Sequence, residues 1–171
     1  MDAFEAVRTL LAVRSYQDKP ITEDSLRRIL EAGRLTGSSM NGQPWHFLVI
    51  QNRDTLHQLG SLLRSGSYVA QAPLAIVVVI DHTQYAVSDA SRAIQSMLLT
   101  AWTEGLGSNW VGFGGLDNIK PLLAIPADVE VFAVLPMGYP GKDIQGRGKK
   151  QRKSLSEVAY REHWGEPFAE I

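Results

Sequence analysis

Three polar side chains alternate in the stretch 38–47, which is the part of the sequence best suited to binding a ligand. Ser39, Asn41 and Gln43 would project from the same side of an extended backbone, and Pro44 favours an extended Gln43. Their hydroxyl and amide groups can exchange hydrogen bonds with a planar polar ligand. The alternative interpretation is a helix-to-strand connection, in which Asn and Ser bond to the backbone of their own turn.

Basic residues mark two further candidate positions. Arg14 follows the first expected helix and is either a surface charge or a ligand for an anion. The run Lys149–Lys153 is typical of a solvated tail, although such a run can also hold a phosphate or a nucleic acid. The net charge of -1 argues against a nucleic-acid partner.

Several common kinds of catalytic site are not indicated. The chain has no cysteine, no nucleophile elbow and no HExxH motif, and its four histidines are scattered, so we expect neither a metal centre nor a cysteine nucleophile. Glycines cluster at 105–107 and 112–115, but they follow a long helix rather than a first strand. This context disfavours a Rossmann site and favours helix caps.

Hydrophobic periodicity predicts helices separated by short strands. Helices are expected at 2–13, 23–34, 55–64, 88–105, 117–123 and 154–164, and strands at 47–50, 74–80, 109–113 and 129–137. Thr22 and Asp54 are the expected N-caps, and 65–68 reads as a turn. The strand 74–80 is apolar throughout, which is typical of a strand buried on both faces. These elements predict a single domain, 1–171, of class α+β or α/β with one small sheet.

The composition and the N-terminal residues predict the cellular location. Hydrophobic residues make up 44% and charged residues 20% of the 171 residues, which are ordinary globular values. The longest apolar run, 73–80, is too short to span a bilayer. Asp2 and Glu5 occupy the region where a signal peptide would be basic and then apolar. We therefore expect a cytoplasmic protein with no membrane partner.

Five segments together resemble the FMN-dependent nitroreductase family. They are AVRSYQDKPI (12–21), SSMNGQPWHFLVI (38–50), SYVAQAPLAIVVV (67–79), EGLGSNWVGF (104–113) and, near the end, AVLPMGYP (133–140) with KKQRKSLSEV (149–158). The resemblance covers nearly the whole chain, in order and at plausible spacing.

This resemblance implies an α+β nitroreductase-like fold, with a small central, mostly antiparallel sheet covered by helices, in an intertwined homodimer. Two FMN molecules would lie at the dimer interface, with NADH or NADPH as reductant. A small-molecule acceptor, such as a nitroaromatic compound, a quinone or another conjugated compound, would take the electrons in a second half-reaction. The flavin would carry the chemistry, so no catalytic side chain is expected. The broad apolar surface of the helix 88–105 also calls for cover by a second copy.

The resemblance also implies which residues contact the cofactor. Arg14 and the pair Lys150 and Arg152 would hold the phosphate or ribityl end, as charged groups suited to phosphate. The loop with Ser39, Asn41 and Gln43 would reach the polar edge of the flavin. The remaining expected contacts are Ser67 and Tyr68, from the partner, and Trp110, Val111 and Gly112, along the isoalloxazine ring.

The sequence departs from the family pattern in two respects. Where many relatives carry arginines and a serine just before Arg14, this chain has Leu10, Leu11 and Ala12, which predicts weak FMN retention. The chain is also short for the family, which predicts an open site and loose acceptor specificity. Other chemistry on this fold (dehalogenation, enone reduction or flavin breakdown) and a non-catalytic flavin-binding protein remain as alternatives.

Overall fold

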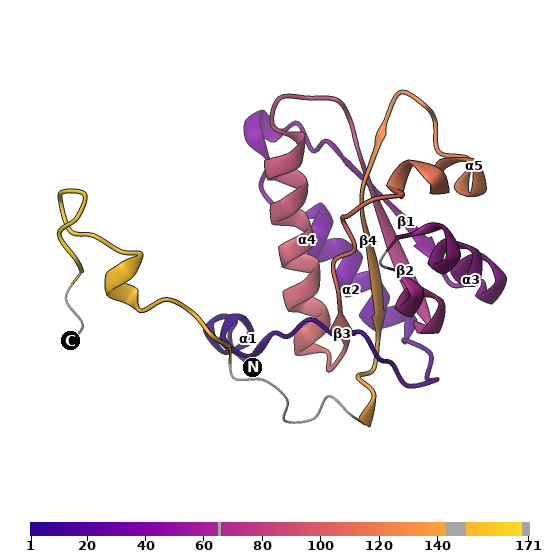
Figure 1. Ribbon diagram of the computed structural model, residues 1–171, viewed down its shortest axis with the longest axis horizontal. Coiled ribbons are helices and arrows are strands. Elements are labelled where there is room, and N and C mark those ends of the chain that lie inside the picture. Colours follow the sequence, from indigo (N-terminus) through magenta and orange to yellow (C-terminus); the bar gives the residue numbers. More distant parts are fainter. Residues whose placement is uncertain (65, 143–149, 169–171) are drawn as a thin grey trace.

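A four-stranded antiparallel sheet forms the centre of the molecule (Figure 1). The computed structural model describes residues 1–64, 66–142 and 150–168. The strands are β1 (Trp45–Ile50), β2 (Leu74–Ile80), β3 (Gly107–Ser108) and β4 (Glu130–Gly138), arranged in the order β1-β2-β4-β3. The expected small antiparallel sheet of an α+β fold is confirmed.

Helices cover both faces of this sheet. Helices α2 (Glu23–Arg34) and α4 (Ala86–Thr103) pack on one face, and α3 (Arg53–Leu62) and α5 (Lys120–Leu123) lie on the other (Figure 1). Side chains of β2 alternate between the two cores, with Ile76 and Val78 toward α2 and α4 and with Val77 and Val79 on the opposite face. Every residue of β2 is buried, which confirms the strand predicted to be covered on both faces.

Local sequence signals define the two long helices. The side chain of Thr22 accepts a hydrogen bond from the backbone N–H of Ser25, and α2 has the predicted bounds. The end of α4 is set by Gly105, whose φ of 77° is in the left-handed region. Leu106 N–H then bonds to Ala101 O at 2.9 Å, which closes a Schellman motif.

The first helix is shorter than predicted, because the chain leaves it to pair with the sheet. Helix α1 spans Ala3–Thr9 rather than 2–13. Beyond it, Ala12 forms a parallel bridge with Ser108, and Val13 N–H bonds to Ser108 O at 2.8 Å. The hydrogen bonds offered by β3 replace those that a longer helix would have made.

Four other predictions are corrected. In place of the expected strand 109–113, the short strand β3 ends at Ser108, and one isolated bridge joins Val111 to Val134. Asn52, not Asp54, caps α3, and the predicted closing helix 154–164 is a single 3-10 turn, Leu155–Glu157. The residues Ser67–Gln71 form a 3-10 helix where a turn was expected. Ser65 of that turn and Lys149 of the basic run lie outside the described residues.

Residues 150–168, called the C-terminal arm below, extend away from the body of the molecule beyond α1 (Figure 1). The arm closes on itself through an antiparallel bridge between Tyr160 and Pro167. Its large apolar side chains are exposed, with Trp164 at 90%, and α1 likewise exposes Phe4 at 76%. None of the described helices is both long enough and apolar enough to cross a membrane.

Candidate functional site

Arg14 is positioned by a segment that runs along the edge of the sheet. Its neighbour Val13 is fully buried, and the segment continues with a hydrogen bond of 2.9 Å from Gln17 N–H to Tyr139 O. Side chains of an extended segment alternate, so Arg14 points to the exposed side. Gly107 permits this packing, because a Cβ there would lie 2.6 Å from Val13 Cβ.

The hydroxyl of Tyr16 secures the same segment. It lies 2.7 Å from Val13 O and 3.1 Å from Pro136 O, and so links the segment to β4. Burial, and to a lesser extent the neighbouring Tyr68, raises the pKa of the Tyr16 hydroxyl well above its ordinary value. Tyr16 therefore remains a neutral donor over the physiological pH range.

Three side chains from three parts of the chain gather beside this segment, and we call them the Arg14 cluster: Arg14, Tyr68 and Asn109. The guanidinium of Arg14 lies 6.0 Å from the centre of the Tyr68 ring, a cation–π contact. Asn109, which is 5% exposed, donates from Nδ2 to the Tyr68 hydroxyl at 2.7 Å and to Trp110 O at 3.3 Å. Ser67 is exposed next to Tyr68.

The stretch 110–112 follows Asn109 and carries a partly exposed indole. Val111 is buried and exchanges two backbone hydrogen bonds of 2.9 Å with Val134 of β4. Trp110 is 36% exposed and makes an edge contact with Phe132, with ring centroids 5.5 Å apart. A Cβ at Gly112 would lie 2.7 Å from Trp110 Nε1, so glycine is required for the indole to fold back here.

The loop 38–43 does not have the extended conformation that we predicted. Residues Ser39–Asn41 form a 3-10 turn, and Met40, Asn41 and Gln43 have φ between 47° and 55°. Asn41 and Gln43 are exposed, and Gln43 Nε2 bonds to Asn41 O at 3.2 Å, as in the alternative turn interpretation. The side chain of Ser39 instead bonds to Asp89 of α4 at 3.0 Å.

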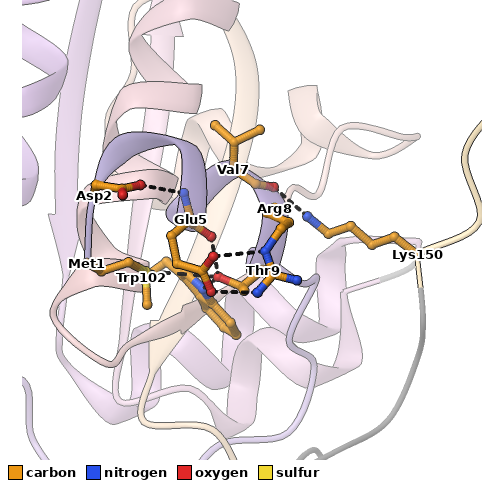
Figure 2. A network of polar contacts seen from close by, with 8 residues as sticks. All are labelled: Met1, Asp2, Glu5, Val7, Arg8, Thr9, Trp102 and Lys150. Carbon is orange, nitrogen blue, oxygen red and sulfur yellow. Dashed lines mark hydrogen bonds and ion pairs between the residues drawn. The ribbon is translucent and has the colours of Figure 1, made fainter. Parts of the chain in front are cut away.

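Lys150, followed by Arg152, lies beside α1, at the end of α4 that is distant from the loop 38–43. Figure 2 shows Lys150 donating from Nζ to Val7 O, at 2.6 Å, next to Arg8. Arg8 itself forms two hydrogen bonds of 2.8 Å with Glu5. Partial burial, and then the nearby Arg152 and Arg8, lowers the pKa of Lys150. These neighbouring cations make an electropositive site.

Helix α4 separates the loop 38–43 from this basic group. Ser39 bonds to Asp89 near the start of α4, whereas Thr9 of α1 accepts a hydrogen bond of 2.8 Å from Trp102 near its end (Figure 2). Asp89 and Trp102 are 13 positions apart, about 20 Å along a helix. The chain thus brings Arg14, Tyr68 and Asn109 together but not the loop 38–43 with Lys150.

Sequence reasoning missed Asn109 and Asp89. The sequence predicts only a strand for Asn109, although a buried polar side chain must find hydrogen-bond partners, and an asparagine within a predicted strand is a signal of this kind. Asp89 lies four residues before Ala93 on the buried stripe of α4, and a charge on such a stripe is a similar signal. Within the described ranges, no group of three or more His, Asp or Glu side chains is placed to hold a metal ion.

Comparison with known proteins decides the family. The family model described as "Nitroreductase family" matches residues 11–84 and 67–139. The chain belongs to this family. A Methanothermobacter thermautotrophicus relative named "Putative NADH dehydrogenase/NAD(P)H nitroreductase" is 36% identical over 152 residues, covering 84% of this chain and 80% of the relative. A protein of the same name from Archaeoglobus fulgidus is 31% identical and covers 95% and 99%.

A solved structure of the nitroreductase family supports the same fold. A Desulfovibrio desulfuricans protein, described as a "putative nitroreductase in complex with fmn", is 30% identical to this chain. The two structures superpose with a TM-score of 0.84 over 99% of each chain. The resemblance to nitroreductases inferred from the sequence, and the nitroreductase-like fold that it implied, are confirmed.

Proposed function

We propose that this protein is a cytoplasmic FMN-dependent NAD(P)H oxidoreductase that reduces nitroaromatic, quinone or related conjugated acceptors in two successive half-reactions. When bound, FMN supplies N5 as the atom that takes and passes on the hydride. The chain supplies binding, orientation and charge. The observation that carries the proposal is the Arg14 cluster, in a chain whose relative from D. desulfuricans was crystallised with FMN.

The donor set of the Arg14 cluster fits such a cofactor. Arg14 is exposed on a segment that is fixed on both sides, and a guanidinium suits a phosphate or carbonyl oxygen. Tyr68 offers an aromatic surface in the cluster, and the exposed indole of Trp110, folded back over Gly112, offers another. Lys150 and Arg152 add positive charge for the phosphate.

The separation along α4 supports a site shared by two protomers. In one chain the loop 38–43 and the basic group beside α1 lie at opposite ends of this helix. In the proposed dimer, the two-fold axis would bring the loop of one protomer near the basic group of the other without any change in the fold. The exposed Trp164 and Phe4 give the C-terminal arm and α1 apolar surface for that partner. We therefore propose a homodimer with FMN at the interface.

An anaerobic absorbance titration tests the activity. FMN is added to the purified protein, and NADH or NADPH follows. We expect visible flavin bands that bleach with the pyridine nucleotide and return on addition of a quinone or nitroaromatic acceptor. Bound flavin that resists both nucleotides would overturn the oxidoreductase proposal in favour of a binding protein.

Flavin affinity tests the assigned residues. With Leu10, Leu11 and Ala12 in place of polar ligands, we expect FMN to dissociate on gel filtration; a dissociation constant in the nanomolar range or below would contradict this. Arg14→Ala should weaken binding by roughly ten-fold or more, because a charge-assisted hydrogen bond is lost. Arg34→Ala is the matched control, since Arg34 is paired with Glu31 on the exposed side of α2.

A further inference from the structure

Helix α4 contains a buried carboxylate that the proposed function has not yet used. Asp89 is 1% exposed, and it is the one charged side chain classed as buried in the described part of the chain. A charge removed from water is costly unless other groups bond to it. The groups that bond to Asp89 therefore indicate the role of this residue.

Both carboxylate oxygens of Asp89 are bonded to the loop 38–43. Oδ2 accepts the backbone N–H of Ser39 at 3.0 Å, and Oδ1 accepts the Ser39 hydroxyl at 3.0 Å. Arg92, one turn further along α4, donates from Nη2 to Oδ1 and balances the charge. Charge-assisted hydrogen bonds of this kind are stronger than neutral ones. Asp89 thus fastens the start of the loop to a long, well-packed helix.

The loop needs this attachment because its backbone is strained. Met40, Asn41 and Gln43 occupy the left-handed region, which non-glycine residues visit rarely and at a cost. Such a conformation persists only when surrounding contacts enforce it. The two hydrogen bonds to Asp89 supply that constraint, together with the bond of 3.0 Å from Gln43 N–H to Ser38 Oγ.

The same contacts determine how Ser39 can meet a ligand. A serine hydroxyl has one proton to donate and two lone pairs that accept. The proton of Ser39 Oγ is directed to Asp89, and so is the backbone N–H. Arg92 Nη2 donates to Ser39 Oγ at 3.4 Å and so uses one of its lone pairs. The second lone pair is what Ser39 has left to offer. A group that binds beside it must therefore be a hydrogen-bond donor.

We propose that Asp89 is a positioning residue for the cofactor: it holds the loop 38–43 in place and orients Ser39 Oγ as an acceptor for a donor group of the bound flavin. This inference rests on the proposed function, in which the loop meets FMN. The donors that FMN presents are the isoalloxazine N3–H and the ribityl hydroxyls. Arg92 forms an ion pair with Asp89 on the side of the carboxylate that accepts the Ser39 hydroxyl.

Asp89→Asn reverses this polarity with little change in shape. The amide oxygen can keep the Ser39 N–H, but the amide NH2 then faces Ser39 Oγ and forces its proton outward. We expect FMN affinity to fall by about ten-fold. Ser39→Ala removes one hydrogen bond and should lower affinity by about 2- to 12-fold. Because both variants act through one hydroxyl, the double variant should lose less than the product of the two losses.

A flavin-free measurement separates this inference from the proposed function. Amide hydrogen exchange over 38–43 should accelerate in Asp89→Ala and stay unchanged in Asp117→Asn, a control at an exposed carboxylate. Faster exchange together with non-additive affinities supports the positioning role. Unchanged exchange, or affinity losses that multiply, overturns it. If the wild-type protein binds no FMN, the proposed function fails, and loop exchange alone decides whether Asp89 positions the loop.

Discussion

At the scale of single residues, buried polar side chains fix the exposed ones that would meet a ligand. Asn109 fixes the hydroxyl of Tyr68, and Tyr16 holds the segment that carries Arg14. Both side chains donate hydrogen bonds to oxygen atoms of neighbouring segments. Substitutions of Asn109 or Tyr16 should therefore affect the site indirectly, by displacing the exposed side chains that they hold.

Tyr16→Phe should make stability less dependent on alkaline pH. Burial raises the pKa of the Tyr16 hydroxyl above its ordinary value of about 10, so above that pH the unfolded chain loses a proton that the folded protein keeps. The contribution of Tyr16 is therefore complete below pH 10 and declines as the pH rises, by up to about 1.4 kcal/mol per pH unit.

Urea unfolding between pH 8 and pH 11 measures this effect. At pH 8, Tyr16→Phe should cost about 0.5–1.5 kcal/mol for its lost hydrogen bond, and the difference from the wild type should shrink above pH 10. Tyr85→Phe, at an exposed tyrosine, is the control. Equal alkaline slopes for Tyr16→Phe and the wild type would contradict the assignment.

At the scale of elements, the packing of the segment 10–17 on β3 affects both the stability of the fold and the position of Arg14. Gly107→Ala should therefore lower both the stability and the FMN affinity. A methyl group at this position meets Val13 close to the backbone, where neither side can move away, so we expect a loss of roughly 1–3 kcal/mol in unfolding free energy. Because Arg14 follows Val13, FMN affinity should fall as well.

Gly37→Ala provides the comparison for that variant, since nothing lies within 4 Å of a Cβ built there. Thermal unfolding and flavin titration of both variants test the prediction. A Gly107→Ala protein with wild-type stability and wild-type FMN affinity would show that the segment can shift without consequence.

The elements predicted correctly are those with complete local signals. Helix α2 has its cap and apolar stripe within its own residues, and β2 has an uninterrupted apolar run. The failures depend on distant partners: residues 10–13 leave the helix to pair with β3, and 109–113 bonds to β4 only through Asn109 and Val111. The local pattern of apolar and polar residues does not indicate which distant segment will pair with these residues.

The same distinction explains the candidate site. Residue types suited to binding, such as Arg14 and Tyr68, were found from the sequence, and the structure places both in one cluster. The left-handed loop and the anchoring role of Asp89 were not found, because both arise from contact between residues 50 positions apart. The predicted extended alternation of Ser39, Asn41 and Gln43 failed for this reason.

At the scale of the whole molecule, the exposed apolar surface of α1 and the C-terminal arm predicts association. At micromolar concentration the protein should sediment at twice the 18.9 kDa of one chain. Phe4→Asp places a charge on this surface and should raise the dimer dissociation constant by about 30-fold or more, as for an aromatic hot spot.

Phe4→Leu, which keeps the surface apolar, should leave the dimer nearly unchanged. Sedimentation velocity over a dilution series of the three proteins measures both effects. A wild-type monomer at micromolar concentration would overturn the shared site, and with it the assignment of the loop 38–43 and the basic group to one cofactor.

The position of β2 in the sheet also affects how the chain is made. Its neighbour β1 is synthesised first, but its other neighbour, β4, follows only after residues 81–129. Until then the Leu-Ala-Ile-Val-Val-Val-Ile strand has one unpaired edge and no charge to discourage another chain from adding there. Pairing across so long a stretch is intrinsically slow. A nascent or partly refolded chain is therefore most prone to aggregate at β2, and rapid dilution at low protein concentration is the condition that favours recovery.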